Sequence, residues 1–356
     1  MSRATWAEIN LHALQHNLQV SRSQTSARQM AIIKANGYGH GIVEVARALS
    51  AADAYGVATV EEGITLREAG IHQPIILLEG IQRAEECLLT HAYKLDCVIY
   101  HAHQVELIKQ TSKPMRLWLK LDTGMHRLGF SADEFHAALK DLASLPHVEH
   151  PVKLMTHLAC ADDRESAMTV EQIALFDTHT QAYAANEKTV ANSAGILAWP
   201  SSHGDWVRPG IMLYGVSPFI TGTGSEYSLQ PVMTLRSELI AVNALRQGDT
   251  VGYGASYRCE QDMRVGVVAI GYGDGYPRHA PAGTPVLVNG KLASLIGRVS
   301  MDMITVDLSN VEAANVGDPV VLWGEGLAVE VIAERAGTIA YELLCGVTKR
   351  VPMQYQ

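Results

Sequence analysis

A lysine directly follows an apolar run near the start of the chain, and a glycine-rich loop follows that lysine. The stretch IIKANGYGHG covers residues 32–41, with Lys34 after the run and glycines at positions 37, 39 and 41. A lysine at a strand end is ordinarily a solvated residue, since lysine is rarely buried without a partner. A partly neutral lysine amine, however, suits Schiff-base chemistry. Because glycine is costly wherever ordinary backbone would serve, the pattern indicates a site.

Further polar residues stand where other apolar runs end, and each also has an ordinary structural interpretation. They are Lys120, Asp122, His157, Asn192, Ser193 and Arg208, with Arg127 a few residues beyond the first pair. Ser193 is well placed as a helix N-cap, and the HLACADD stretch after His157 is only a weak metal-ligand pattern. A Ser-rich or Gly-rich turn that opens a helix suits a phosphate. Pyridoxal 5'-phosphate is a cofactor that both reacts with an amine and carries one phosphate, so these residues together indicate a site for it.

Parallel strands with crossover helices are the elements that position these residues. Eight short apolar runs alternate with segments of helical spacing between about residues 30 and 215: MAIIK, YGVATV, PIILLE, DCVIY, MRLWLKL, VKLMTH, KTVANS and WVRPG. This alternation predicts a (β/α)₈ barrel of the TIM type, whose catalytic groups lie at the C-terminal strand ends. A doubly wound open sheet is the alternative. No G-x-G-x-x-G follows any run, which disfavours a dinucleotide fold.

The remainder of the chain is rich in β-branched residues and predicts a mainly β C-terminal domain. Runs such as VMTLRSELIAVNAL and RVGVVAIGYG are separated by glycines and by the Asn289-Gly290 turn, a hairpin signal. The stretch FITGTGSEYSLQ (219–230) is the predicted linker. We therefore expect a barrel domain over residues 1–225 and a β-rich domain over residues 226–356.

The net charge, the cysteine spacing and the apolar stretches of the chain disfavour several classes of protein. The chain has 356 residues, a net charge of −9 and five widely spaced cysteines without a C-x-x-C pair. The acidic balance argues against nucleic-acid binding, and the cysteines favour reduced thiols in a cytoplasmic protein over disulfides or a metal site. No signal core and no membrane-length apolar stretch is apparent, so we expect no membrane association.

A series of motifs resembles that of the bacterial alanine racemases. The motifs span residues 34–345 in the family's order: KANGYGHG, WLKLDTGMHRLGF, MTHLACAD, DWVRPGIMLYG, VGYGASY, AIGYGDGYPR, RVSMDM and AYELLC. The resemblance implies a pyridoxal-phosphate enzyme that interconverts L- and D-alanine. Gly37, His126 and Ser300 depart from or vary within the family pattern, and none carries an expected catalytic role.

The resemblance also implies roles for individual residues. Lys34 would bind the cofactor covalently, and Lys34 and Tyr253 would be the two catalytic acid/base groups, with Tyr253 serving the L face. The other expected cofactor contacts are Tyr38, His157, Asn192, Ser193, Arg208, Gly210, Ile211 and Tyr341. The expected substrate contacts are Arg127, Met301, Asp302 and Tyr272. Relatives carry a carbamate on the lysine that matches Lys120, so the same modification is expected here.

Two features of this assignment have a chemical rationale. Racemisation removes a proton from one face of the α-carbon and returns one to the other, so two opposed bases serve it better than one. Arginine can only donate hydrogen bonds, so Arg208 opposite the pyridine nitrogen would keep that nitrogen unprotonated.

The resemblance further implies a head-to-tail homodimer with shared active sites. Two other interpretations stay open at this point: a decarboxylase of the same architecture and a non-enzymatic pyridoxal-phosphate carrier. The VGYG tyrosine with RVSMDM disfavours the decarboxylase, and the long β-rich region disfavours the carrier. The physiological role also stays open, because supply of D-alanine for peptidoglycan and catabolism of alanine use the same chemistry. The sequence likewise leaves open whether serine or other small amino acids are accepted as substrates.

Overall fold

A closed barrel of eight parallel strands forms the first large unit of the chain. The computed structural model describes residues 4–356. The barrel strands are β2 (Arg28–Ile32), β3 (Ala54–Val57), β4 (Ile75–Leu77), β5 (Leu95–Ile99), β6 (Leu117–Lys120), β7 (Lys153–Met155), β8 (Lys188–Thr189) and β9 (Trp206–Val207). Strand β9 pairs in parallel with β2 and so closes the ring. The predicted (β/α)₈ barrel is confirmed, and the open doubly wound alternative is wrong.

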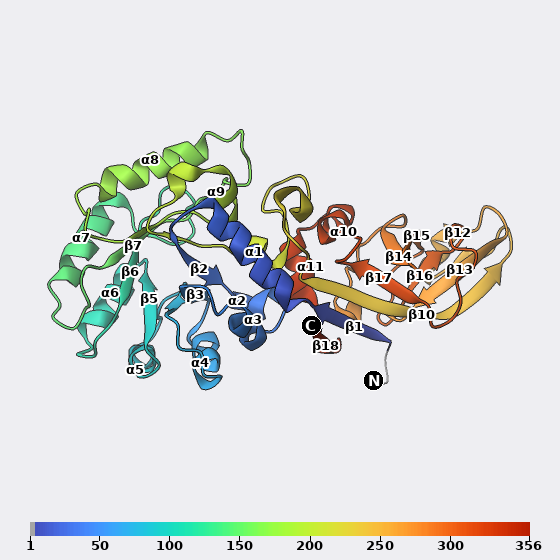
Figure 1. Ribbon diagram of the computed structural model, residues 1–356, viewed down its shortest axis with the longest axis horizontal. Helices are drawn as coiled ribbons and strands as arrows, with labels where there is room; N and C mark the ends of the chain where they lie inside the picture. Colours follow the sequence, from blue (N-terminus) through green and yellow to red (C-terminus); the bar gives the residue numbers. More distant parts are fainter. Residues whose placement is uncertain (1–3) are drawn as a thin grey trace. The chain divides into compact units, whose positions relative to one another are not determined.

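Helices cover the outside of the barrel, as Figure 1 shows for α4 to α8. The helices of this part are α1 (Leu11–Gln24), α3 (Ile42–Ala48), α4 (Val60–Glu68), α5 (Ala84–Ala92), α6 (Ala102–Lys109), α7 (Ala132–Ala143), α8 (Met168–Thr180) and α9 (Ser193–Ala198). Helix α7 illustrates why they form. Ser131 and Glu134 make a capping box at its start, and Phe135, Leu139 and Leu142 at helical spacing are buried.

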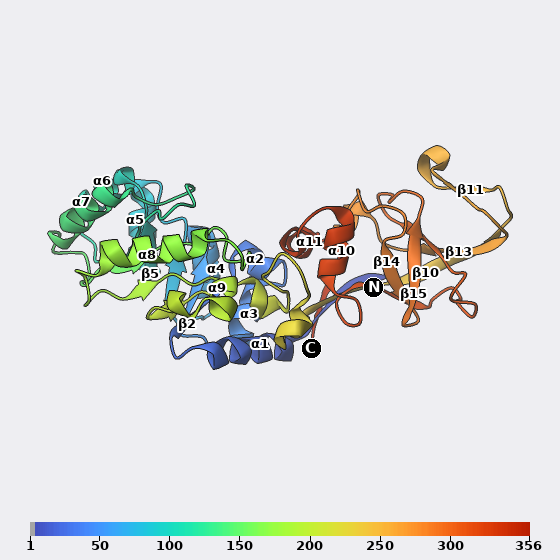
Figure 2. The ribbon, with the colours of Figure 1, turned by 90° about the horizontal axis from the view of Figure 1, so that it is seen from above.

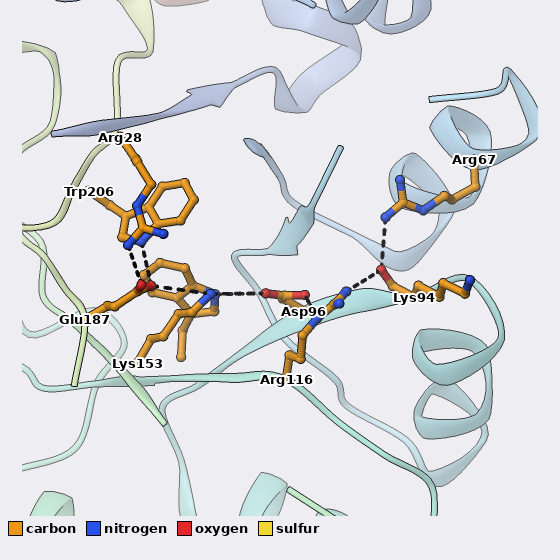
Figure 3. A network of polar contacts seen from close by, with 9 residues as sticks. Arg28, Arg67, Lys94, Asp96, Arg116, Lys153, Glu187 and Trp206 are labelled. Carbon is orange, nitrogen blue, oxygen red and sulfur yellow. Dashed lines mark hydrogen bonds and ion pairs between the residues drawn. The ribbon is translucent and has the colours of Figure 1, made fainter. Parts of the chain in front are cut away.

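Charged side chains and two tryptophans gather at the N-terminal ends of the barrel strands (Figure 3). Figure 3 labels Arg28, Asp96, Arg116, Lys153, Glu187 and Trp206 among them. The second tryptophan is Trp118, whose ring centroid lies 4.8 Å from Lys153 Nζ. The buried Asp96 carboxylate accepts a hydrogen bond from Arg116 Nε at 2.6 Å and lies 4.0 Å from Lys153 Nζ. Glu187 bonds Arg28 and accepts from Trp206 Nε1 at 2.9 Å. This end of a barrel ordinarily serves stability, whereas catalysis occupies the opposite end.

The second unit is a mainly antiparallel sheet. Its strands are β1 (Thr5–Ile9), β10 (Met233–Leu245), β13 (Met263–Val268), β14 (Pro285–Val288), β15 (Lys291–Ile296), β16 (Ile304–Asp307), β17 (Pro319–Trp323) and β18 (Met353–Tyr355), with a ribbon of β11 (Thr250–Val251) and β12 (Tyr257–Arg258). The long strand β10 pairs with β1, β13 and β17, so the sheet curls back on itself. Asn289 and Gly290 both have positive φ at the β14–β15 turn, which confirms the predicted hairpin.

Two helices complete this unit. They are α10 (Val329–Ala336) and α11 (Ala340–Gly346), which lie side by side (Figures 1 and 2). Figure 2 also shows the β11–β12 ribbon projecting from the end of β10 and β13.

The limits of the two compact units differ from the predicted domains at the N-terminus. Residues 4–14 group with the sheet, together with residues 214–217 and 222–356, whereas residues 15–213 and 218–221 form the barrel unit. The reason is that β1 pairs antiparallel with β10 and parallel with β18. The predicted linker contains a short 3₁₀ helix, η3 (Gly224–Tyr227).

Two further findings concern residues 4–356. All five cysteines are free thiols. None of the helices in this range has the length and apolar character needed to span a bilayer.

Candidate active site

Lys34 follows strand β2 and opens a turn of unusual backbone conformation. The turn, labelled α2 (Lys34–Tyr38), has left-handed φ values at Ala35, Asn36, Gly37 and Tyr38. Side chains oppose this conformation, at a cost of about 1–2 kcal/mol per residue. At Gly37 an added Cβ would lie 3.0 Å from a Val45 methyl, so glycine suits the position both conformationally and sterically. The glycine-rich loop therefore sets the backbone on which Lys34 and Tyr38 are carried.

Tyr38 reaches from this turn to the segment after β9. An added Cβ on Gly210 would lie 2.9 Å from the Tyr38 hydroxyl oxygen, so only glycine admits this approach. The Ser193 hydroxyl accepts hydrogen bonds from the backbone N–H of Gly210 at 2.8 Å and of Met212 at 3.4 Å. The hydrogen of the Ser193 hydroxyl can therefore be donated to a further acceptor. A tyrosine hydroxyl, a serine hydroxyl and backbone N–H groups thus meet at one corner of the barrel end.

Asn192, not Ser193, is the N-cap of helix α9. Its side-chain oxygen accepts from the Gly195 N–H at 3.0 Å, which fixes the start of the helix. The interpretation of Ser193 as the N-cap is therefore wrong. The structure leaves the Ser193 hydroxyl pointing toward Gly210, while it commits the Asn192 oxygen to the cap. Ile211 begins the 3₁₀ helix η2 (Ile211–Tyr214) directly after Gly210.

Asp122 fixes the loop that carries Arg127 at the end of strand β6. One carboxylate oxygen accepts from the N–H groups of Gly124 at 2.9 Å and His126 at 3.1 Å. Burial pushes the Asp122 pKa upward, but these hydrogen bonds outweigh it and the pKa lies below its usual value. Gly129 lets the loop return against Asp122, since an added Cβ would lie 2.6 Å from the Asp122 nitrogen. Arg127 is exposed on this loop.

Lys120 is buried at the same strand end, among positive charges. Burial, then the charges of Arg208 and Arg127, lower the Lys120 pKa to about 8, and Asp122 offsets this only in part. Within residues 4–356 no ion pair joins Lys120 to Asp122, whose oxygens bind the loop instead. A partly neutral, nucleophilic lysine therefore stands beside the arginines at neutral pH.

His157 and the buried Arg208 lie in contact at the ends of β7 and β9. Arg208 Nη2 donates to His157 Nδ1 at 3.1 Å. Because arginine has no acceptor, Nδ1 must be unprotonated and Nε2 must carry the ring hydrogen. Burial, followed by the charges of Arg208, Lys120, Arg127 and Lys34, lowers the His157 pKa well below its usual value. His157 is therefore a neutral hydrogen-bond donor through Nε2.

Several residues that hold Arg208 gave no signal in the sequence. Arg208 donates to the Thr189 hydroxyl at 2.7 Å and to the backbone oxygens of Thr156 at 2.8 Å and Val190 at 2.9 Å. Gln172 on helix α8 donates to the His157 carbonyl at 3.2 Å. Burial without a carboxylate lowers the Arg208 pKa to about 10. Threonines at strand ends are too common to mark such a role, so only the assembled barrel reveals it.

The remaining predicted residues belong to the β unit. Tyr253 lies on η4 (Tyr253–Ala255), between β11 and β12, and is 71% exposed. Tyr272 lies on η5 (Tyr272–Asp274), and its N–H donates to Ser300 at 3.0 Å. Met301, in the loop between β15 and β16, accepts from the N–H of Gly273 at 2.9 Å. The structure thus brings Tyr272 and Met301 together. Tyr341 lies on helix α11.

Arg350 binds the two loops that carry these residues. Its Nη2 donates to Asp302 at 2.5 Å, and its Nε lies 3.5 Å from Asp274. The hydrogen bond to Asp302 raises the pKa of Arg350. Gly273 accommodates the guanidinium, because an added Cβ would lie 2.2 Å from Nη1. Arg350 was not predicted, since it lies outside the motif series.

Family models match both units of the chain. The alanine racemase N-terminal domain matches residues 9–218, and the alanine racemase C-terminal domain matches residues 232–355. The chain belongs to the alanine racemase family. The family assignment predicted from the motif series is confirmed.

Relatives and solved structures agree with this family. The chain is 51% identical to an alanine racemase of Aeromonas hydrophila subsp. hydrophila, with 99% of both chains covered. It is 50% identical to one from Coxiella burnetii (strain RSA 493 / Nine Mile phase I), over 99% of this chain and 98% of that protein. The crystal structure of the biosynthetic alanine racemase from Pseudomonas aeruginosa matches with a TM-score of 0.96 and 44% identity, over 99% of each chain.

Proposed function

We propose that this member of the alanine racemase family interconverts L- and D-alanine with pyridoxal 5'-phosphate. The observation that carries the proposal is the grouping, at the C-terminal end of the barrel, of a lysine, a phosphate-sized set of donors and a buried arginine. Lys34 opens the turn from which Tyr38 reaches Gly210 beside the Ser193 hydroxyl. Family membership and the relatives' shared name support the same activity.

The residues present fit this cofactor. The Tyr38 and Ser193 hydroxyls and the Ile211 N–H are hydrogen-bond donors suited to a phosphate. The Gly210 N–H, which donates to Ser193 Oγ in this structure, is proposed as a further donor that the phosphate would share with that oxygen. Arg208 is held by neutral acceptors and presents only donors, which suits an unprotonated ring nitrogen. When bound, pyridoxal phosphate supplies an electron-withdrawing ring conjugated to the substrate amine, which makes the α-proton removable. Asn192 supports the site as the cap of α9, and Tyr341 of the β unit is proposed as a further phosphate contact.

Two side chains move the proton in this proposal. The Lys34 amine serves the D face of the α-carbon, and the Tyr253 hydroxyl serves the L face. His157 Nε2–H is a donor for the Tyr253 oxygen, because its Nδ1 is occupied by Arg208. Arg127 and the Met301 N–H bind the substrate carboxylate, with Asp302 beside them and Tyr272 at the approach to the site.

A carbamate on Lys120 is part of the proposal. Carbamate formation requires a neutral amine, and a pKa of about 8 leaves a substantial fraction of Lys120 neutral at pH 7–8. The negative charge formed would then oppose the charges of Arg208 and Arg127, which act on the same group.

A homodimer with shared sites, in the cytoplasm, completes the proposal. Tyr253, whose hydroxyl is assigned to proton transfer, is 71% exposed, and Met301, whose N–H is assigned to the substrate, is 52% exposed. Such exposure is unusual at a catalytic site, and a partner subunit would bury both residues. Five free thiols fit a reducing compartment. Supply of D-alanine for peptidoglycan is the proposed role, and the Pseudomonas aeruginosa relative is described as biosynthetic.

Incubation with L-alanine in D₂O tests the activity. We expect D-alanine to form with deuterium at the α-carbon of the product, measured by chiral separation and mass spectrometry. Release of CO₂ without D-alanine would instead identify a decarboxylase and contradict the proposal.

A further inference from the structure

The left-handed turn after Lys34 needs an external support. Ala35, Asn36 and Tyr38 all adopt φ values near +50°, at which side chains are unfavourable. Backbone bonds within the turn supply part of the support, such as Gly37 N–H to Ile33 O at 2.8 Å. The Asn36 side chain accepts from the Ile42 N–H at 3.1 Å and so joins the turn to α3. The carbonyls of Ala35, Asn36 and Gly37 also accept from backbone N–H groups, those of Gly39 at 3.0 Å, Gly41 at 2.9 Å and His40 at 3.0 Å.

The His40 side chain binds two carbonyls of the turn. The imidazole is fully buried, and its Nδ1 lies 2.8 Å from the Tyr38 carbonyl oxygen and 3.1 Å from the Gly37 carbonyl oxygen. Both partners are acceptors, so Nδ1 must carry the hydrogen. Burial lowers the His40 pKa to about 4, so the ring is neutral at physiological pH and keeps this tautomer. The ring hydrogen therefore binds two successive carbonyls, with its shorter bond to Tyr38, while the Gly37 carbonyl also accepts the His40 backbone N–H.

The orientation of these peptides decides where Tyr38 points. The Tyr38 hydroxyl oxygen lies 2.9 Å from the position that a Cβ on Gly210 would take, so a small rotation of the turn would move it away from Gly210. Lys34 begins the same turn four residues earlier. The relative placement of the lysine amine and the tyrosine hydroxyl therefore depends on the geometry that His40 holds.

We infer that His40 is a positioning residue, whose Nδ1–H orients the Gly37 and Tyr38 carbonyls and thereby sets Lys34 and Tyr38 toward the cofactor. The inference rests on the proposed function, since it concerns the site proposed for pyridoxal phosphate. It assigns His40 no contact with the cofactor itself.

Two substitutions separate hydrogen bonding from packing. His40→Asn keeps an N–H donor near the position of Nδ1 but loses volume, whereas His40→Leu keeps the volume and loses the donor. A packing role predicts that the asparagine variant is the more damaged of the two. The positioning role predicts the opposite order for cofactor retention.

The readout is the rate at which purified holoenzyme releases pyridoxal phosphate to a trap, together with the visible absorbance of the bound cofactor against pH. Loss of a buried hydrogen bond of this kind should accelerate release by roughly 10–100-fold in His40→Leu, and His40→Asn should stay within about threefold of the parent. His40→Leu should also shift the absorbance titration. If His40→Leu does not fold, His40→Gln replaces it, because its amide extends past the Nδ1 position.

His147→Leu is the matched control, because His147 also bonds a backbone carbonyl of the barrel, that of Ile108 at 3.0 Å, away from the proposed site. It should leave release and absorbance unchanged. Equal release from the parent and His40→Leu, or faster release from His40→Asn than from His40→Leu, would overturn the inference. A parent protein that binds no pyridoxal phosphate would instead defeat the proposed function.

Discussion

At the residue scale, the barrel end gathers cations around one neutral histidine. Lys34, Lys120, Arg127 and Arg208 all act on His157, and Asp122 is committed to its own loop. The chain as a whole carries a net charge of −9, so attraction of anions depends on this local cluster. Such a cluster binds anionic groups such as a phosphate or a carboxylate. A carbamate on Lys120 would lower the net positive charge of the cluster.

Lys120→Met should change how stability depends on pH. The Lys120 pKa is about 8 in the folded protein and 10.5 in the unfolded chain, so the unfolded state binds more protons between these values. The free energy of unfolding of the parent should therefore rise by up to about 3 kcal/mol from pH 8 to 10.5, relative to the variant, in CO₂-free buffer. Urea denaturation at each pH measures this difference.

The exposed Lys113 gives the control, because Lys113→Met should leave the pH dependence unchanged. In isotope-labelled bicarbonate, a carbamate carbon signal should appear by NMR in the parent and be missing in Lys120→Met. A parent whose stability falls over this pH range relative to the variant, or a carbamate signal that survives the substitution, would contradict the account.

At the element scale, the residues at the ends of the barrel strands show which parts of the site the sequence predicts and which it does not. The eight apolar runs and the motif residues after them were readable from sequence, since periodicity and residue type are local properties. The left-handed turn at Lys34 and the supports of Arg208 were not, because they arise from contacts between strands far apart in sequence. Local propensity did not identify the N-cap of α9, because both Asn192 and Ser193 are good capping residues. Only the observed hydrogen bond from the Gly195 N–H identifies Asn192 as the cap.

Glu187→Gln tests whether the N-terminal end of the barrel serves stability while the C-terminal end serves catalysis. Glu187 is 30% exposed and bonds Arg28, Trp206 and Lys153 (Figure 3). Burial opposes its charge, but these partners lower the Glu187 pKa below its usual value. The variant should lose about 1 kcal/mol of unfolding free energy at pH 7. This loss should vanish as the pH falls below 4.5 and the parent's carboxylate protonates.

Turnover should stay at the parental value in Glu187→Gln, because the network lies at the N-terminal strand ends and Lys34 at the C-terminal ends. Glu149→Gln, at an exposed position outside the helices, is the stability control. A large fall in kcat with unchanged stability would show that this separation is wrong.

At the scale of the whole molecule, the proposed catalytic residues are divided between two units. Lys34, Arg127 and Arg208 belong to the barrel unit, whereas Tyr253 and Met301 belong to the sheet unit. The proposed homodimer joins the barrel of one subunit to the sheet of its partner. The fold class of each unit was predictable from sequence, but β1 was assigned to the barrel, because a five-residue strand shows nothing of its distant partner β10.

Mixing two inactive variants tests the shared site. Lys34→Ala and Tyr253→Phe should each be nearly inactive alone. After subunit exchange at equal amounts, about half of the dimers are mixed, and each mixed dimer has one intact and one doubly defective site. Racemase activity should therefore recover to about a quarter of the parental value. With exchange verified by mass spectrometry of differently tagged subunits, no recovery would defeat the shared-site proposal.

The central claim is that Lys34 and Tyr253 are opposed bases, and α-proton exchange in Tyr253→Phe tests it most directly. Rates of racemisation cannot assign the two faces, since the enantiomers of alanine are equal in free energy and both directions must fall together. In D₂O, exchange from L-alanine should fall by about 10²–10⁴ in this variant, whereas exchange from D-alanine should survive in part through Lys34. Equal loss of exchange from both enantiomers would contradict the account.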